Sequence, residues 1–65
     1  MNIKDLKCFE AVYRACSISG AARKLFITPQ GLSKVIQSLE NELNTVLFTR
    51  TAQGVKPTET ASFLY

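Results

Sequence analysis

The sequence lacks histidine entirely and contains only two cysteines, Cys8 and Cys16, among its 65 residues. Imidazole and thiolate groups are the usual zinc ligands, so too few of them are present to build a zinc site. If both cysteines lie on one helix, about 12 Å separates them along its axis, which exceeds the ~7 Å Cα limit for a disulfide. We therefore expect reduced thiols that pack as small buried hydrophobic residues, with no metal and no cofactor.

Long hydrophobic runs are also missing from the sequence. Charged residues at positions 4, 5, 7 and 10 interrupt the opening segment, which excludes the apolar core of a secretory signal peptide. No segment approaches the ~20 apolar residues that a membrane-spanning helix needs. We expect a cytoplasmic chain with no membrane partner.

The absence of histidine also removes the commonest general base of enzymes. The carboxylates of Glu40 and Glu42 would lie roughly 160° apart around a helix, too far to act as a pair on one substrate. RNA binding usually relies on exposed aromatic rings, and the two tyrosines and four phenylalanines mostly fall at expected core positions. These absences argue against an enzyme and against an RNA-binding module.

What the sequence does contain is a surplus of positive charge. Eight Lys and Arg residues against five Asp and Glu residues give a net charge of +3 and a pI near 9.1. A chain this short suffices for one domain and buries only ~60% of the surface that its unfolded form exposes. The charge favours a polyanionic partner, and the placement of the basic side chains must decide whether one is bound.

Apolar residues recur every three or four positions near the amino terminus, which is the spacing of an amphipathic helix. They predict a first helix over residues 3–16. Ser19 is predicted to cap a short second helix, residues 20–26, because its hydroxyl can accept a hydrogen bond from a first-turn amide. The inward residues Ala21 and Ala22 of that helix are small and should allow another helix to approach closely.

Thr28 followed by Pro29 predicts the start of a third helix, since the hydroxyl can cap it and proline suits its first position. This helix should run to Leu43. At 100° per residue its apolar residues fall within an arc of roughly 100°, and polar residues lie opposite. The apolar side chains are Leu32, Val35, Ile36, Leu39 and Leu43, and the polar ones are Gln30, Ser33, Lys34, Gln37 and Asn41.

Two short extended segments, residues 47–50 and 55–56, flank a bend over residues 51–54, where Gly54 can supply a positive φ. Thr58 followed by an acidic residue predicts the start of a fourth helix. Because that helix has barely begun at residue 65, we expect a fragment whose helix continues further.

The apolar positions of these segments define one expected core. Its members are Ile3, Leu6, Phe9, Ala22, Leu25, Leu32, Ile36, Leu39, Phe48 and Val55. Packing of this core beneath the third helix would turn the polar face of that helix outward.

Five segments, in their order and spacing, resemble the amino-terminal DNA-binding domain of the LysR-type transcriptional regulators. They are SGAARKL (19–25), ITPQGLSKVI (27–36), LE (39–40), LFTR (47–50) and GVKPTE (54–59). The resemblance covers essentially the whole chain. It implies a mainly α fold, a winged helix-turn-helix of three helices and a short β-hairpin wing over residues 1–57. Residues 58–65 would begin a linker helix that pairs two subunits.

The resemblance also implies sequence-specific binding of double-stranded DNA. The helix over about 29–43 would enter the major groove, and the wing over about 47–57 would lie on the backbone or the minor groove. The full-length protein would be a homodimer or higher oligomer, with a small-molecule effector bound by a carboxy-terminal domain absent here. A winged-helix module that binds another protein is the alternative, favoured if the basic residues cluster away from the third helix.

The residues expected to touch DNA fall into two groups. Amide, hydroxyl and ammonium groups can match the donors and acceptors of base edges, and phosphate contacts fix the register. The expected base contacts are Pro29, Gln30, Ser33, Lys34 and Gln37. The expected backbone contacts are Ser19, Arg23, Lys24, Thr28, Thr49, Arg50 and Lys56.

Phe26 occupies the turn between the second and third helices, where helix-turn-helix patterns prefer glycine. A bulky side chain is disfavoured at positive φ. The turn is therefore either strained or of another geometry.

Overall fold

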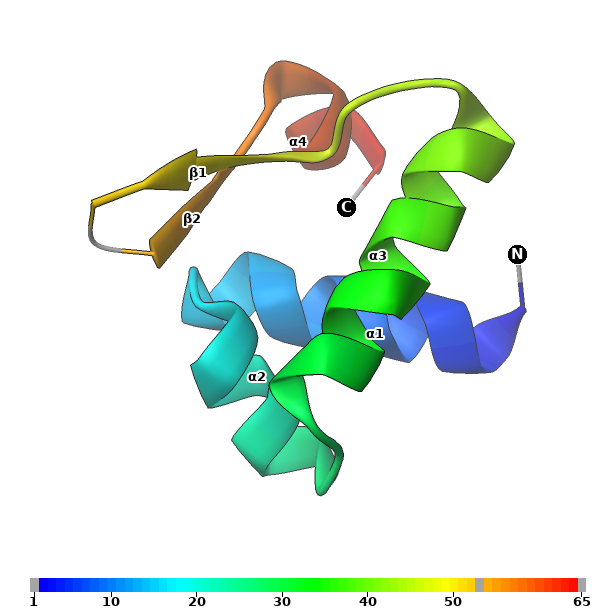
Figure 1. Ribbon diagram of the computed structural model, residues 1–65. Helices are drawn as coiled ribbons and strands as arrows, with labels where there is room; N and C mark the ends of the chain where they lie inside the picture. Colours follow the sequence, from blue (N-terminus) through cyan, green and yellow to red (C-terminus); the bar gives the residue numbers. More distant parts are fainter. Residues whose placement is uncertain (1, 53, 65) are drawn as a thin grey trace.

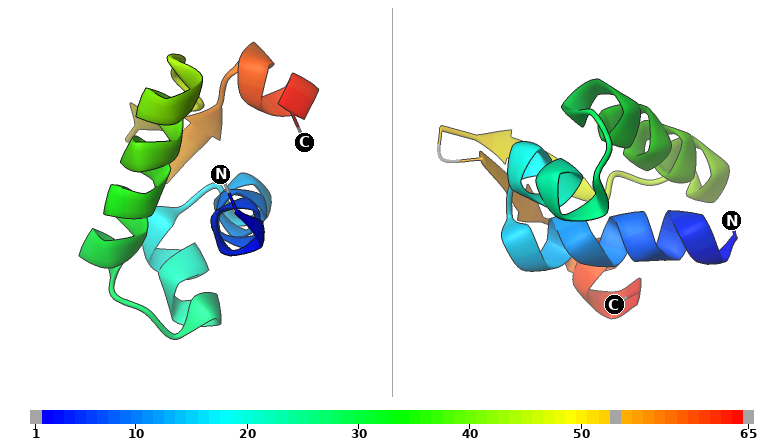
Figure 2. Two further views of the ribbon diagram at one scale, coloured as in Figure 1. Left: turned by 90° about the vertical axis from the view of Figure 1, so that its right-hand side faces the viewer. Right: turned by 90° about the horizontal axis from the view of Figure 1, so that it is seen from below.

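Four helices and a two-stranded antiparallel sheet make up the computed structural model, which describes residues 2–52 and 54–64 (Figure 1). The elements are α1 (Ile3–Ala15), α2 (Ile18–Leu25), α3 (Pro29–Leu43), β1 (Phe48–Thr51), β2 (Gly54–Pro57) and α4 (Glu59–Leu64). Helix α3 crosses α1, and the hairpin lies beside α3 and α2 (Figures 1 and 2). The predicted fold class is confirmed.

Asn2 caps the amino-terminal end of helix α1, and its side chain accepts a hydrogen bond from the Asp5 amide at 2.8 Å. Its buried residues are Cys8, Phe9 and Val12. The prediction that Ile3 and Leu6 join the core is wrong, because 73% and 43% of these side chains are exposed. The amino-terminal turns of α1 project away from α2 and the hairpin, so these elements do not cover them (Figure 2).

Helix α2 begins two residues earlier than predicted. Ser17, not Ser19, is its cap, and the Ser17 hydroxyl accepts a hydrogen bond from the Gly20 amide at 3.0 Å. The reason is that Cys16 adopts a left-handed conformation, with φ 52°, and ends α1 abruptly. Ser17 is thereby left extended at the cap position, and Ser19 lies inside the first turn.

The turn at Phe26 is strained, which decides between the two alternatives that the sequence left open. It is left-handed, with φ 59°, and caps the carboxyl end of α2 while its side chain is 94% exposed. The Phe26 amide donates to the Arg23 carbonyl, and the Ile27 amide donates to the Ala22 carbonyl at 3.0 Å. These bonds are those of a Schellman-type helix end, where glycine is the usual residue.

The hairpin formed by β1 and β2, which we call the wing, connects Thr51 to its partner Gly54 through residues 52–53. Gly54 has φ 140°, so the predicted positive φ is confirmed. Gln53, which the predicted bend includes, lies outside the described residues, as does Tyr65 at the end of the predicted fourth helix. The Val55 amide donates to the Cys16 carbonyl at 3.0 Å, which attaches the wing to the turn between α1 and α2.

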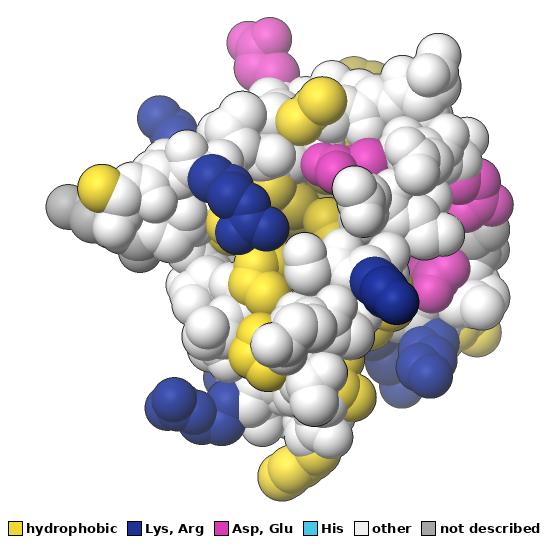
Figure 3. All heavy atoms as spheres, in the orientation of Figure 1, with side chains coloured by type: hydrophobic (Ala, Val, Ile, Leu, Met, Phe, Trp, Pro, Cys, Tyr) yellow, Lys and Arg dark blue, Asp and Glu magenta, His cyan; other side chains and the backbone are white. Residues whose placement is uncertain are grey.

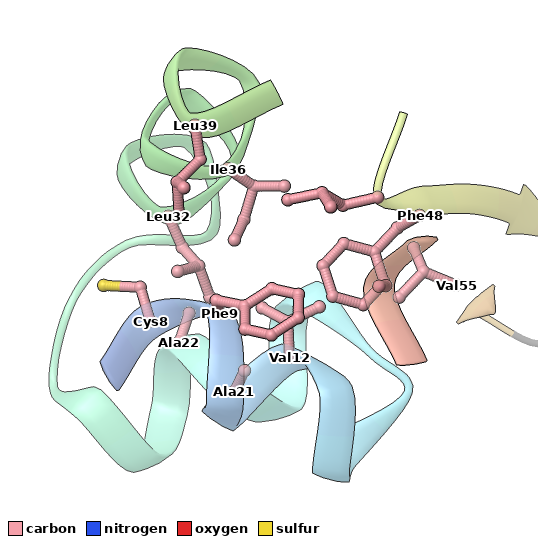
Figure 4. Packing of buried hydrophobic residues seen from close by; sticks show 12 residues of the cluster. Cys8, Phe9, Val12, Ala21, Ala22, Leu32, Ile36, Leu39, Phe48 and Val55 are labelled. Atoms are coloured by element: carbon pink, nitrogen blue, oxygen red, sulfur yellow. The ribbon is translucent and has the colours of Figure 1, made fainter. Parts of the chain in front are cut away.

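The core lies between the helices and the inner face of the wing (Figure 4). The rings of Phe9 in α1 and Phe48 in β1 form a tilted pair with centroids 5.6 Å apart. Most of the expected core is confirmed, although Leu25 is only partly buried. The buried residues are Cys8, Phe9, Val12, Ala21, Ala22, Leu32, Ile36, Leu39, Leu47, Phe48, Val55 and Ala61. Cys16 is exposed, so the expectation of two buried thiols holds for Cys8 alone, and both cysteines are free.

Helix α4 begins at Glu59, one residue after the predicted start at Thr58. The Thr58 hydroxyl accepts from the Ala61 amide at 3.2 Å and donates to the Val46 carbonyl at 2.8 Å. Among the described residues, none of the helices has the length and apolarity that crossing a membrane requires. Nor do the described residues contain a cluster of side chains suited to a metal ion.

Candidate nucleic-acid interface

Helix α3 buries one face and exposes the other, as the sequence predicts. Leu32, Ile36 and Leu39 lie in the core. The opposite face carries Pro29, Gln30, Lys34, Gln37 and Asn41, which are all exposed, together with the half-buried Ser33. The apolar packing thus presents amide, hydroxyl and ammonium groups to solvent, where they can meet the edges of bases.

The amino-terminal end of α3 is exposed, and its local structure follows from Thr28 and Pro29. The Thr28 hydroxyl oxygen accepts a hydrogen bond from the Gly31 amide at 3.0 Å, so the predicted cap is confirmed. A hydroxyl that accepts one bond keeps its proton for donation to another oxygen. The helix dipole adds positive potential at this end, which favours an anion there.

A groove separates α3 from the wing. Its floor is apolar and includes Ile18, Ile36, Phe48 and Val55, and its rim carries Ser33, Gln37, Glu40 and Arg50. Figure 3 shows hydrophobic side chains running down the middle of this face, with Lys and Arg side chains on both sides of them. Acidic side chains lie at the top and on the right of the same view, and one lies in the upper middle beside the hydrophobic side chains.

Arg50 faces this groove because of the register of the wing. Residues directly opposite each other in an antiparallel pair share one face of the sheet. Arg50 pairs with the buried Val55, whereas Thr49 pairs with Lys56. Since faces alternate along a strand, Thr49 and Lys56 lie on the other face of the wing. The structure therefore does not bring these two residues to the groove beside α3.

Ser19 and Arg50, which come from distant parts of the chain, line one hollow between the start of α2 and the wing. Both side chains are exposed. The other residues that line this hollow are Ser17, Ile18, Thr51, Gly54 and Val55. Two of the expected backbone contacts thus line the same hollow, although Ser19 does not have the capping role that the sequence suggested.

Three further basic side chains lie in the amino-terminal half of α3 or in the last turn of α2 before it. Arg23 and Lys24 occupy the last turn of α2, directly before the turn that leads into α3, and both are exposed. Lys34 lies on α3 itself. Glu40 and Glu42, in contrast, belong to its carboxy-terminal half. Along α3 and the turn before it, the positive charge is therefore concentrated at the amino-terminal half, which favours a polyanion there.

Glu40 is a residue whose role at this site the sequence reasoning missed. Its carboxylate accepts hydrogen bonds from the Leu47 amide at 2.8 Å and the Phe48 amide at 3.3 Å. These bonds connect α3 to the first strand of the wing. The only sequence signal was the pair LE at positions 39–40, which suggests no partner seven or eight residues away.

The chain is similar to regulatory proteins of bacteria. A family model for the bacterial regulatory helix-turn-helix proteins of the lysR family matches residues 3–62. The transcriptional activator protein NhaR of Escherichia coli K12 is 37% identical over 65 residues, covering 100% of this chain and 22% of NhaR. The nitrogen assimilation regulatory protein nac of the same strain is 40% identical over 65 residues, covering 100% of this chain and 21% of nac. The chain spans about a fifth of the length of these relatives.

The chain is also similar to solved structures of two domains in complex with DNA. The BenM DBD in complex with benA site 1 DNA superposes with a TM-score of 0.94 at 40% identity, covering 100% of this chain and 73% of that one. The CbnR DBD in complex with DNA also gives a TM-score of 0.94, at 30% identity, covering 98% of this chain and 74% of that one.

Proposed function

Because the chain belongs to the LysR family of bacterial regulatory helix-turn-helix proteins, we propose that it binds double-stranded DNA in a sequence-specific manner. Helix α3 enters the major groove, and the wing lies on the backbone or the minor groove. The observation that carries this proposal is the exposed polar face of α3, backed by the buried Leu32, Ile36 and Leu39. The structural similarity to two domains in complex with DNA supports it.

In this proposal the base contacts are Pro29, Gln30, Ser33, Lys34 and Gln37. Glutamine can form two hydrogen bonds with adenine, and lysine can donate to the acceptors of guanine. Pro29 offers only apolar contact, which suits the methyl group of thymine. A face dominated by amide and hydroxyl groups, with a single lysine, favours discrimination between bases over general attraction to phosphate.

The proposed backbone contacts begin with Arg50 and Ser19, which line one hollow beside α3. Thr28 at the start of α3, and Arg23 and Lys24 at the end of α2, add hydroxyl and basic groups at the other end of the interface. Phosphate contacts of this kind fix the register of α3 in the groove. Thr49 and Lys56, on the far face of the wing, would reach only a duplex that bends around it.

We also propose the wider setting of the domain. Residues 1–57 form the DNA-binding unit, and residues 58–65 begin a linker helix through which two subunits pair. The relatives are about five times as long as this chain. In this proposal further residues of the full-length protein bind a small effector and complete an oligomer in the cytoplasm. The protein acts in this reading as a transcription regulator and not as an enzyme.

The test starts with the complete gene product and a random duplex library, because the binding sequence is unknown. Repeated selection should enrich one motif, and titration of that labelled duplex at several salt concentrations should give an affinity that falls as salt rises. A scrambled duplex should bind at least ~10³-fold more weakly. Failure to enrich a motif, or binding that salt does not affect, would overturn the proposal.

The alternative of a protein-interaction module gains no support from the positions of the basic residues. It is favoured if these residues cluster away from α3. Lys34 lies on α3, Arg50 lines the groove beside it, and Arg23 and Lys24 immediately precede it. These are four of the eight basic residues; Lys4, Lys7 and Arg14 belong to α1, and Lys56 lies on the other face of the wing, so the basic residues do not gather at one place away from α3.

A further inference from the structure

The wing contributes to DNA binding only if it is held at a fixed position relative to α3. One carboxylate oxygen of Glu40 accepts hydrogen bonds from two successive amides, Leu47 at 2.8 Å and Phe48 at 3.3 Å. Phe48 is the first residue of β1, and Arg50 follows two residues later, about 7 Å along the strand. The Glu40 side chain is thus bonded to the wing close to the residue proposed to contact phosphate.

Leu47 is held from its other side as well. Its carbonyl accepts a hydrogen bond from the Thr58 amide at 2.9 Å, and its side chain is fully buried. Glu40 therefore acts on a segment that is already packed and bonded. A change at Glu40 should shift the entry of β1 without unfolding the whole domain, because Thr58 and the core still retain Leu47.

The charge of Glu40 makes its presence at this site informative. It is half-buried on the rim of the groove that Ser33, Gln37 and Arg50 also line. A carboxylate there repels phosphate, and it lowers the attraction of the whole interface for DNA. The charge of Glu40 therefore weakens DNA binding. Any favourable effect of this side chain on DNA binding must come from its hydrogen bonds to the two amides.

We propose that Glu40 is a positioning residue for DNA binding, which fixes the wing against α3 so that Arg50 reaches the backbone while α3 occupies the major groove. This inference rests on the proposed function. It assigns Glu40 no contact with DNA. Its effect passes through the Leu47 and Phe48 amides to the strand that carries Arg50.

Two substitutions separate positioning from charge. Glu40→Gln removes the charge but keeps an acceptor oxygen, whereas Glu40→Ala removes both. If charge alone matters, both variants bind the selected duplex more tightly than the wild type. Positioning predicts that Glu40→Gln binds at least as tightly and that Glu40→Ala binds about 2- to 30-fold more weakly. Glu10→Ala, at an exposed site on α1, is the control for loss of one negative charge.

The salt dependence of binding distinguishes a displaced wing from a merely destabilised domain. Each phosphate contact contributes a slope of about −0.9 to log K against log salt. Glu40→Ala should therefore make the slope less steep, as Arg50→Ala does. The double variant should bind DNA no more weakly than Arg50→Ala alone. A smaller folded fraction would weaken binding with an unchanged slope. In the free protein, Glu40→Ala should also accelerate hydrogen exchange at the Leu47 and Phe48 amides.

The outcomes are distinguishable from failure of the proposed function. If the wild type binds no duplex, the proposed function falls, and this role falls with it. If the wild type binds and Glu40→Ala binds equally well or better, only the positioning role is overturned. The positioning role is also overturned if Glu40→Ala keeps the wild-type salt slope. It is overturned as well if the loss of affinity in the double variant equals the sum of the losses in Glu40→Ala and Arg50→Ala.

Discussion

The carbonyl of Cys16 accepts a hydrogen bond from the Val55 amide at 3.0 Å, which joins the wing to the turn between α1 and α2. The approach is so close that a Cβ atom at the adjacent Gly54 would lie 2.4 Å from the same Cys16 oxygen. Gly54 also has φ 140°, a conformation that side chains disfavour. Glycine is therefore required here for two independent reasons.

Gly54→Ala should destabilise the domain by about 1–3 kcal/mol, because either the backbone strain persists or the wing moves away from Cys16. Chemical denaturation followed by circular dichroism measures this change. Gly20→Ala is the matched control, since its Cβ would meet Ser17 at an ordinary 3.4 Å inside α2. The free energy of unfolding of that variant should rise by up to about 1 kcal/mol, because alanine has a higher helix propensity than glycine. Equal effects of the two substitutions would contradict this explanation.

Phe26→Gly should stabilise the protein. Phe26 has φ 59° and a side chain that is 94% exposed. Replacing it with glycine therefore relieves the backbone strain and removes almost no packing. Left-handed geometry costs an L-residue about 1–2 kcal/mol, and the greater freedom of glycine when unfolded offsets part of the gain. We expect a net increase of about 0.5 to 1 kcal/mol in the free energy of unfolding.

Phe26→Ala is the control for this prediction, because alanine removes the ring but keeps a Cβ atom at positive φ. Its stability should stay within about 0.5 kcal/mol of the wild type. If both variants stabilise the protein equally, exposure of the ring, and not the backbone, is the source of the cost.

The sequence predicted α3 well because its signals are local. The cap at Thr28, the proline at its first position and the apolar spacing all lie within the helix or next to it. The structure confirms the cap, the proline and the burial of Leu32, Ile36 and Leu39, whereas Leu43, at the end of the predicted apolar face, is exposed. The start of α2 was misplaced because two serines flank Ile18, and only the left-handed Cys16 decides between them. The residue after Cys16 also lies beside Gly54, a contact that no local pattern contains.

The site was predicted less completely, for a related reason. The helical periodicity identified Gln30, Lys34 and Gln37 as exposed, but it says nothing about which face of the wing meets the groove. That depends on the register, which pairs Arg50 with Val55 and directs Thr49 and Lys56 to the other face. The bonds of Glu40 to Leu47 and Phe48 likewise cross a loop. Which residues touch DNA stays a prediction.

The two cysteines should differ in their reactivity. Burial raises the pKa of the Cys8 thiol, the Asp5 carboxylate raises it further, and Lys4 lowers it. Because the thiolate is the reactive form, Cys8 should react slowly with iodoacetamide at neutral pH, whereas the exposed Cys16 should react readily. Peptide mapping by mass spectrometry measures the two rates, and denaturant should make them similar. Equal rates in the folded protein would contradict the burial of Cys8.

The same shift predicts a dependence of stability on pH. A raised pKa means that the folded state retains the Cys8 proton more firmly than the unfolded state does. The contribution of the neutral thiol to stability is therefore complete below the ordinary thiol pKa and declines as pH rises through the raised value. Cys8→Ala should remove this alkaline loss, which denaturation curves at neutral and alkaline pH can measure.

Substitutions at Gln30 and Arg50 should separate base recognition from backbone attraction. Gln30→Ala should cost about 1–3 kcal/mol on the selected duplex and little on duplexes altered at the base that it contacts, because it removes discrimination at that base. Arg50→Ala should weaken binding to all duplexes alike and lower the salt slope by about 1. Panels of single-base variants, titrated at several salt concentrations with both proteins, measure the two effects. If Gln30→Ala weakens every duplex equally, α3 binds DNA without using this side chain to distinguish bases.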